Sequence, residues 1–130
     1  MTNAPPQDPA LLRCLLRARD RMDAASHEAW PVHRLARVSR LCAAHFARSF
    51  KEAFGVRPHR YLLTRRIERA TSLLRDTDLP VTDVAFQTGW ASLGPFGRIF
   101  RDITGQSPAT LRAQLLHTAP ELARVPACIV

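Results

Sequence analysis

The sequence predicts an all-α protein of about seven helices, in which two similar subdomains are joined by a long linker helix. Three observations lead to this fold class. Apolar residues recur at helical spacing along most of the chain, a block of about 28 residues occurs twice, and an amphipathic segment separates the two copies. The 130 residues suffice for one compact core or two small ones, but not for a catalytic domain beside a binding domain.

The predicted elements follow one another without long gaps. The first subdomain is expected over residues 9–57, the linker helix over 58–76, the second subdomain over 77–116 and a loose tail over 117–130. The first subdomain opens with the amphipathic segment PALLRCLLRARDRMDAA, and a further helix at 108–116 closes the second. The leucines expected to face inward in the opening helix are Leu11, Leu12, Leu15 and Leu16.

Residues 31–58 and 80–108 share one pattern. Pro31, Val32, Leu35 and Ala36 correspond to Pro80, Val81, Val84 and Ala85 at an offset of 49, and Phe46, Arg48, Phe50, Gly55 and Pro58 correspond to Phe96, Arg98, Phe100, Gly105 and Pro108 at an offset of 50. One inserted residue explains the change of offset. Because prolines and glycines are among the matches, an internal duplication is the simplest explanation.

Each copy predicts two short helices separated by a turn. Proline is compatible with the first position of a helix, where its missing N–H would be unpaired anyway. In the second copy Gly89 supplies a turn and Ser92 an N-cap, and Gly55 and Gly105 end the second helices of the two copies. The aromatics at helical spacing are expected in the core rather than stacked on bases. Two such helices with an arginine-bearing outer face predict a helix-turn-helix.

The linker helix is predicted from an apolar stripe formed by Leu63, Ile67, Ala70 and Leu74, with Arg65, Arg66 and Arg69 on the remaining surface. A helix of about eighteen residues is roughly 27 Å long, which makes it a stiff spacer of nearly one turn of DNA.

Positive charge is concentrated in one segment. Nineteen basic and eleven acidic residues give a net charge of +8, and residues 32–75 alone carry +9, whereas residues 76–115 carry −1. Genome composition can explain the preference for Arg over Lys, but it does not explain why the basic residues are concentrated in one segment. A local arginine surface of this strength favours a polyanion as partner, and a membrane surface fits less well because no long basic helix has a bulky aromatic face.

Other classes of function lack their usual sequence signals. No apolar run approaches a membrane span and no secretory signal is visible, so a cytoplasmic protein is expected. The three cysteines form no CxxC motif, and the five histidines lack the spacing that is typical of metal ligands. We therefore expect reduced thiols, no metal site and no cofactor. No GxSxG, HExxH or Gly-rich phosphate loop occurs, and no catalytic residues are assigned.

The duplicated unit around a linker helix, with FGRIFRDITGQSPATLR in the second copy, resembles the DNA-binding domain of AraC/XylS regulators over about residues 9–115. The resemblance implies seven helices and two recognition helices that enter neighbouring major grooves. A chain this short looks like the MarA/SoxS/Rob group, whose members bind DNA as monomers through this module alone. A DNA-binding fragment of a longer, effector-responsive regulator is the other possibility. Double-stranded DNA is the expected partner, with RNA polymerase as a candidate protein partner.

By that resemblance, Arg48 and Arg98 occupy the base-reading positions of the two recognition helices. Each follows a core Phe by two residues, hence on the helix's other side, and Arg pairs bidentately with guanine, although a phosphate contact is the alternative for both. The full set of expected DNA-contacting residues is Arg40, Ala43, Ala44, His45, Ala47, Arg48 and Lys51 in the first copy, Arg65 and Arg66 in the linker, and Leu93, Gly94, Gly97, Arg98 and Arg101 in the second copy.

The sequence also departs from the family pattern. Arg40 stands where Gly is common, and Cys42 stands where a capping Ser is usual. Gly94 and Gly97 weaken the second recognition helix by roughly 1 kcal/mol each relative to Ala, and leave few side chains for base reading. We therefore expect the first copy to supply most of the binding energy. A sequence-specific regulator explains the repeat, the linker and the charge together, whereas a non-specific or architectural DNA-binding protein explains only the charge.

Overall fold

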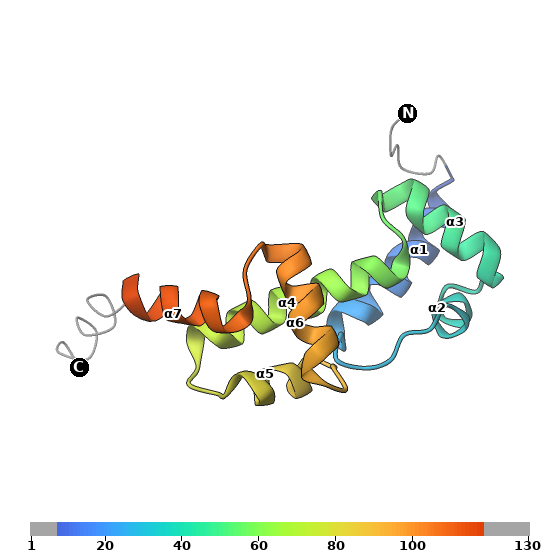
Figure 1. Ribbon diagram of the computed structural model, residues 1–130. Helices are drawn as coiled ribbons and strands as arrows, with labels where there is room; N and C mark the ends of the chain where they lie inside the picture. The colour runs from blue at the N-terminus through green and yellow to red at the C-terminus, as the bar shows by residue number, and fades with distance from the viewer. Residues whose placement is uncertain (1–7, 119–130) are drawn as a thin grey trace, which may run out of the picture. The chain divides into compact units, whose positions relative to one another are not determined.

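The computed structural model describes residues 8–118, and all regular secondary structure in this range is helical (Figure 1). The seven helices are α1 (Pro9–Ala24), α2 (Val32–Ser39), α3 (Ala43–Phe54), α4 (Pro58–Asp76), α5 (Val81–Gln87), α6 (Leu93–Thr104) and α7 (Pro108–Thr118). The predicted fold class is thereby confirmed for this part of the chain. Helix α7 continues to Thr118, so the first two residues of the expected loose tail are helical; residues 119–130, which include Cys128, lie outside the described residues. None of the helices within 8–118 is long and apolar enough to cross a membrane.

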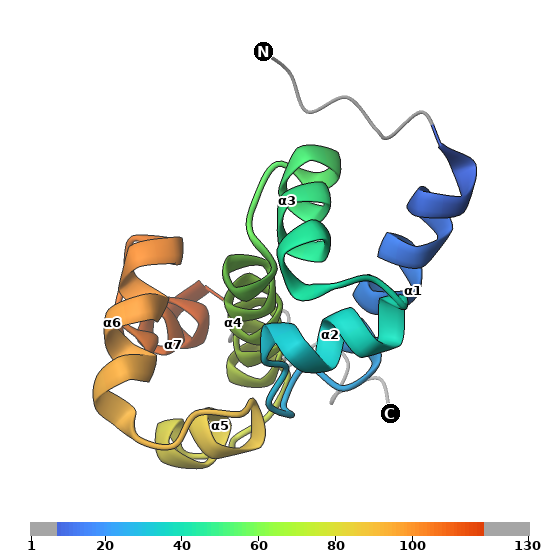
Figure 2. The same ribbon diagram turned by 90° about the vertical axis from the view of Figure 1, so that its right-hand side faces the viewer.

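The chain forms two compact units, and the division between them falls inside α4. The first unit extends to Arg66 and the second begins at Ile67. The first unit therefore holds α1, α2, α3 and the start of α4, and the second holds the end of α4, α5, α6 and α7. In each unit a short helix is followed by a tight turn and a longer helix, as Figure 2 shows for α2 and α3.

The core of the first unit is a single cluster of buried apolar side chains from all four of its helices. Its members are Leu15, Ala18, Met22, Trp30, Leu35, Ala36, Phe46, Phe50 and Leu62. The expectation that all four leucines of α1 face inward holds only in part: Leu15 is fully buried and the half-buried Leu11 packs against the core cluster, whereas Leu12 and Leu16 are half-buried. Positions 15, 18 and 22 lie on one helical face, so the small Ala18 and the flexible Met22 take the inner places instead.

A polar link joins α1 to α4 within the first unit. The Tyr61 hydroxyl donates a hydrogen bond to Asp23 Oδ1 at 2.7 Å, and its ring packs edge-on against Phe50 with centroids 5.7 Å apart. Burial, reinforced by the bond to Asp23, raises the pKa of Tyr61 to about 12. The phenol therefore stays protonated at neutral pH and keeps its donor role.

The second unit repeats the aromatic core of the first. The rings of Phe46 and Phe50 lie 5.6 Å apart, and those of Phe96 and Phe100 lie 5.6 Å apart as well. All four are at most 1% exposed, which confirms that these aromatics are core residues. From α4 the buried side chains of this unit are Ile67, Ala70 and Leu74, as predicted, but Leu63 is only half-buried and Leu62 takes the inner position in the first unit.

The ends of the helices follow the duplicated pattern in both units. Gly55 and Gly105 end α3 and α6 in the left-handed conformation, at φ 84° and 83°. Pro31 and Pro80 are N-caps with extended ψ angles of 156° and 151°, so each helix begins one residue later than the repeat suggested. Ser92 occupies the N-cap of α6 as predicted, although its side chain makes no capping hydrogen bond.

Candidate nucleic-acid interface

Helix α3 separates an aromatic inner face from an outer face of small and basic side chains. Phe46, Ser49 and Phe50 are buried, so the opposite side of the helix faces solvent. On that outer side Ala43, Ala44, His45, Arg48 and Lys51 are exposed and Ala47 is half-buried. The helix thus presents small side chains followed by two cations, the arrangement expected of a helix that approaches a nucleic acid closely.

The turn before α3 carries backbone strain. Arg40 ends α2 at φ 63° and ψ 31°, and it is the one non-glycine residue with positive φ in the described chain. An L-residue in this conformation brings its Cβ close to the backbone, which costs on the order of 1 kcal/mol. The equivalent turn of the second unit has Gly89 at φ 102°. Arg40 is exposed, so its side chain gains no packing that would offset the strain.

A groove runs along α3 where the start of α4 returns beside it. Its volume is about 680 Å³, and we call it the α3–α4 groove. It is lined by Val32, Ala44, Ala47, Arg48, Lys51, Glu52, Arg57, Pro58 and His59. Four of the predicted contact residues therefore meet in one concave surface, whereas Arg40, Ala43 and His45 lie outside its lining.

Five lining residues of this groove were not among the predicted contacts, and two of them, Arg57 and His59, carry side-chain nitrogens that can donate hydrogen bonds. Both are exposed and both follow Gly55, whose left-handed conformation turns the chain back toward α3. The signal was present in the segment GVRPH, a glycine stop followed by a basic residue and a helix-initiating proline. The duplicated segment of the second unit, GQSPA, has no basic residue at these places.

Helix α6 presents a more open surface than α3. Leu93 is 44% exposed, and Gly94, Arg98 and Arg101 are exposed as well. Gly97 is half-buried, yet a Cβ built on Gly94 or on Gly97 meets no atom within 4 Å, and neither residue has a positive φ. Neither glycine is therefore required by the fold of the second unit.

The linker arginines that were predicted to contact DNA both interact with the first unit. Arg66 donates from Nε to the Ser26 carbonyl at 2.8 Å and from Nη2 to the Glu28 carbonyl at 2.7 Å. Its partial burial lowers the pKa of the guanidinium. Arg65 Nε lies 3.1 Å from Asp23 Oδ1. Arg66 thus fixes the loop between α1 and α2, and the structure places neither residue beside the α3–α4 groove.

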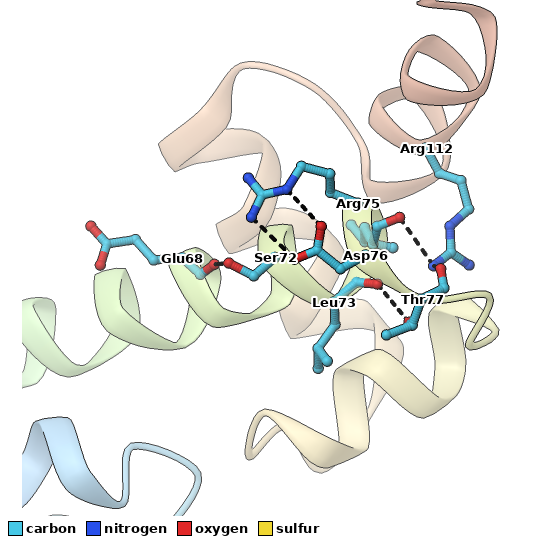
Figure 3. Close-up of polar contacts among 8 residues, drawn as sticks. Glu68, Ser72, Leu73, Arg75, Asp76, Thr77 and Arg112 are labelled. Carbon is cyan, nitrogen blue, oxygen red and sulfur yellow. Dashed lines mark hydrogen bonds and ion pairs between the residues drawn. The ribbon is translucent and has the colours of Figure 1, made fainter. Parts of the chain in front are cut away.

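Arg112 holds the corresponding loop of the second unit, between α4 and α5. Its guanidinium donates to the carbonyls of Leu79, Thr77 and Leu74, the last two at 3.1 and 3.4 Å. Figure 3 shows Arg112 beside Thr77. Nearby, Arg75 pairs with Asp76 at 2.9 Å, and the Thr77 hydroxyl donates to the Leu73 carbonyl at 2.6 Å (Figure 3). In both units an arginine from a later helix therefore binds the carbonyls that precede the helix-turn-helix.

Comparisons with known proteins agree with this geometry. A family model described as a helix-turn-helix domain matches residues 35–114. An uncharacterized HTH-type transcriptional regulator of Staphylococcus aureus (strain COL) is 41% identical over 69 residues, 53% of this chain and 9% of that protein. The probable transcriptional regulator LumQ of Photobacterium leiognathi is 34% identical over 77 residues, 59% of this chain and 31% of that protein. The chain thus spans under a third of either relative's length.

Solved structures match over much more of their length. The DNA-binding domain of the global transcriptional factor AdpA, crystallised with a target DNA, superposes with a TM-score of 0.78 at 30% identity, covering 82% of this chain and 96% of that domain. An AraC-type regulator from Chromobacterium violaceum gives a TM-score of 0.75 at 25% identity, covering 82% and 95%. With two helix-turn-helix units and near-complete coverage of these domains, the chain belongs to the AraC-type helix-turn-helix family.

Proposed function

We propose that the chain is a sequence-specific DNA-binding transcription regulator, or the DNA-binding part of one, and that it reads two adjacent major-groove segments as a monomer. The observation that carries this proposal is the duplicated reader. Each unit exposes one arginine-bearing helix, α3 with Arg48 and α6 with Arg98, opposite a buried aromatic pair. Two readers in one chain can contact two groove segments without a second protein.

The comparison that supports DNA as the partner is the AdpA domain, which was solved in complex with a target DNA and is almost fully covered by this chain. A role without enzymatic activity and a cytoplasmic location accord with this function. RNA polymerase is a candidate protein partner, because a regulator bound beside a promoter acts through it. The small share of the curated relatives that the chain spans, 9% in the Staphylococcus protein, also accords with a module that serves within longer regulators.

Selection of bound duplexes from a random pool tests this function directly. We expect an enriched site with two conserved blocks about one helical turn apart, bound at least a thousandfold more tightly than a scrambled duplex of the same composition. Mass measurement of the complex should give one protein per site. A site that is occupied only by two protein chains would contradict the monomer, and equal affinity for the scrambled duplex would favour an architectural binder instead.

A further inference from the structure

We propose that the α3–α4 groove seats one strand of the DNA sugar-phosphate backbone, with Arg57 as its phosphate contact. This inference rests on the proposed function and adds a contact that neither the repeat nor the recognition helix indicates. Arg57 belongs to neither helix, since it stands in the connection between α3 and α4. It reaches the same concave surface as Arg48 and Lys51 because the chain reverses at Gly55.

The charges of the groove are complementary to a phosphate strand. Arg48, Lys51 and Arg57 contribute positive charge to its lining, His59 adds a ring nitrogen that can donate a hydrogen bond, and Glu52 is the one acidic lining residue. The rest of the lining is small or apolar: Val32, Ala44, Ala47 and Pro58. The small side chains leave room for a sugar to approach, while the phosphate of that nucleotide contacts the Arg57 guanidinium.

The position of the groove favours DNA over a free anion as its occupant. Ala44, Ala47, Arg48 and Lys51 belong both to the groove and to the predicted reading face of α3. A strand whose base edges meet Arg48 must carry its own phosphates past the side of the same helix. The backbone of that strand therefore lies where Arg57 and His59 are found.

Arg57 lies at the start of α4, where a cation is unfavourable for the isolated protein. Its carbonyl accepts the Tyr61 N–H at 3.0 Å at the start of α4, just as the Ser107 carbonyl accepts the Leu111 N–H at 3.0 Å at the start of α7. Ser107 also caps its helix, because its hydroxyl accepts the Thr110 N–H at 3.0 Å. Arginine offers no such acceptor, and a cation at the positive end of a helix is unfavourable. A phosphate at Arg57 would remove both disadvantages.

The test compares Arg57→Ser with the wild-type chain on the selected duplex and on its scrambled counterpart, over a range of salt concentrations. Losing one phosphate contact should lower the log–log salt slope by about 0.9 and weaken binding roughly eightfold at 0.1 M salt, equally on both duplexes. The melting temperature should stay the same or rise, because serine can cap α4 as Ser107 caps α7. Reduced binding together with undiminished stability separates a lost contact from a folding defect.

Three further variants define the effect. Arg57→Lys keeps the charge and should keep the salt slope. Arg17→Gln removes the same charge from an exposed position on α1 outside the groove, and should leave both the slope and the affinity near wild type. Glu52→Gln, which removes the acidic lining residue, should strengthen binding to both duplexes a few-fold.

Each other result overturns the proposal in a recognisable way. An unchanged salt slope for Arg57→Ser means that no phosphate lies there, and a loss confined to the selected duplex means that Arg57 reads a base. If inorganic phosphate protects the Arg57 region in amide exchange while DNA does not, the groove is a free-anion site. Equal affinity of the wild-type chain for the two duplexes refutes the sequence-specific function instead. In that case the salt slope of Arg57→Ser still shows whether a phosphate binds in the groove.

Discussion

Helices α3 and α6 share the same buried aromatic pair but carry different surfaces. Phe46 and Phe50 under α3 have the same 5.6 Å ring spacing as Phe96 and Phe100 under α6. On the outside, Ala44 and Ala47 correspond to Gly94 and Gly97, and Arg57 corresponds to Ser107. The scaffold of the duplicated unit has been kept while its outer chemistry has diverged, so the fold alone does not decide how strongly each unit binds.

The two units differ less in the number of cations available to DNA than their net charges suggest. Residues 32–75 carry +9. Within that segment Arg65 and Arg66 contact groups of the protein itself, and Arg34 stacks on Trp30 at 3.6 Å while pairing with Glu28 at 2.8 Å. In the second unit Arg112 is likewise directed at backbone carbonyls. The four predictions that follow test the comparison, from the largest expected effect to the smallest.

Removing a loop-binding arginine should have the largest effect on stability. Arg66→Ala deprives two carbonyls of charge-assisted hydrogen bonds, and Arg112→Ala deprives up to three. Each should lower the free energy of unfolding by about 2 kcal/mol in urea denaturation. Arg69→Ala, at an exposed position of α4, is the control and should change it by less than about 0.5 kcal/mol. A stable Arg66→Ala protein with a reduced salt slope on DNA would instead make Arg66 a phosphate contact.

The base-reading arginines should differ between the units. Arg48→Ala should weaken binding to the selected duplex by about 1–3 kcal/mol and relax one base position. Arg98→Ala should weaken it by less, because α6 offers fewer neighbouring cations than the groove beside α3. Titrations of both variants on the same duplex measure the difference. A larger loss for Arg98→Ala would reverse the proposed ranking of the two units.

Gly97→Ala should stabilise the second unit by about 1 kcal/mol, since the added methyl meets no atom within 4 Å. Thermal unfolding measures the gain, and the reciprocal Ala47→Gly should destabilise the first unit by a similar amount. The DNA affinity of Gly97→Ala then shows whether DNA binding requires a glycine at position 97. Weaker binding despite greater stability indicates that the α6 backbone lies against the DNA, whereas unchanged binding indicates that it does not.

Arg40→Gly should have the smallest effect, a gain in stability of about 0.5 kcal/mol. Relief of the left-handed strain at φ 63° is partly offset by the greater entropy of glycine in the unfolded chain. Arg40→Ala retains the Cβ and should bring no such gain, which makes it the matched control. If Arg40→Gly were less stable than the wild-type chain, the arginine side chain would have to supply an interaction that outweighs the strain.

The sequence predicted those features that depend on residues close together in the chain. Helical spacing and paired glycines located all seven helices, because periodicity and left-handed stops are local properties. The aromatic cores followed from the same pattern. Contacts between distant segments were not predictable in this way: Arg66 reaches carbonyls about 40 positions earlier, and nothing in the sequence near it identifies them.

The candidate site shows the same limit. Ala44, Ala47, Arg48 and Lys51 were predicted because they share one helical face of α3, and the exposure of Arg48 and Lys51 accords with that interpretation. Glu52, which lines the same groove from α3, was not predicted. Arg57 and His59 were missed because their proximity to α3 depends on the direction in which the chain leaves Gly55. In α1, the choice of Leu15 over Leu11, Leu12 and Leu16 for the core depended on packing against other helices, which hydrophobicity alone does not encode.

The position of the unit boundary within α4 has a consequence for folding cooperativity. Leu62 belongs to the core of the first unit, whereas Ile67, Ala70 and Leu74 are buried in the second. A helix of this length is only marginally stable without tertiary packing, so each half of α4 depends on the unit that buries it. Unfolding of one unit therefore frays the helix toward the other and removes hydrogen bonds across residues 66 and 67. Amide exchange in the middle of α4 should accordingly respond to destabilising substitutions in either unit, so the two DNA readers are expected to fold as coupled parts.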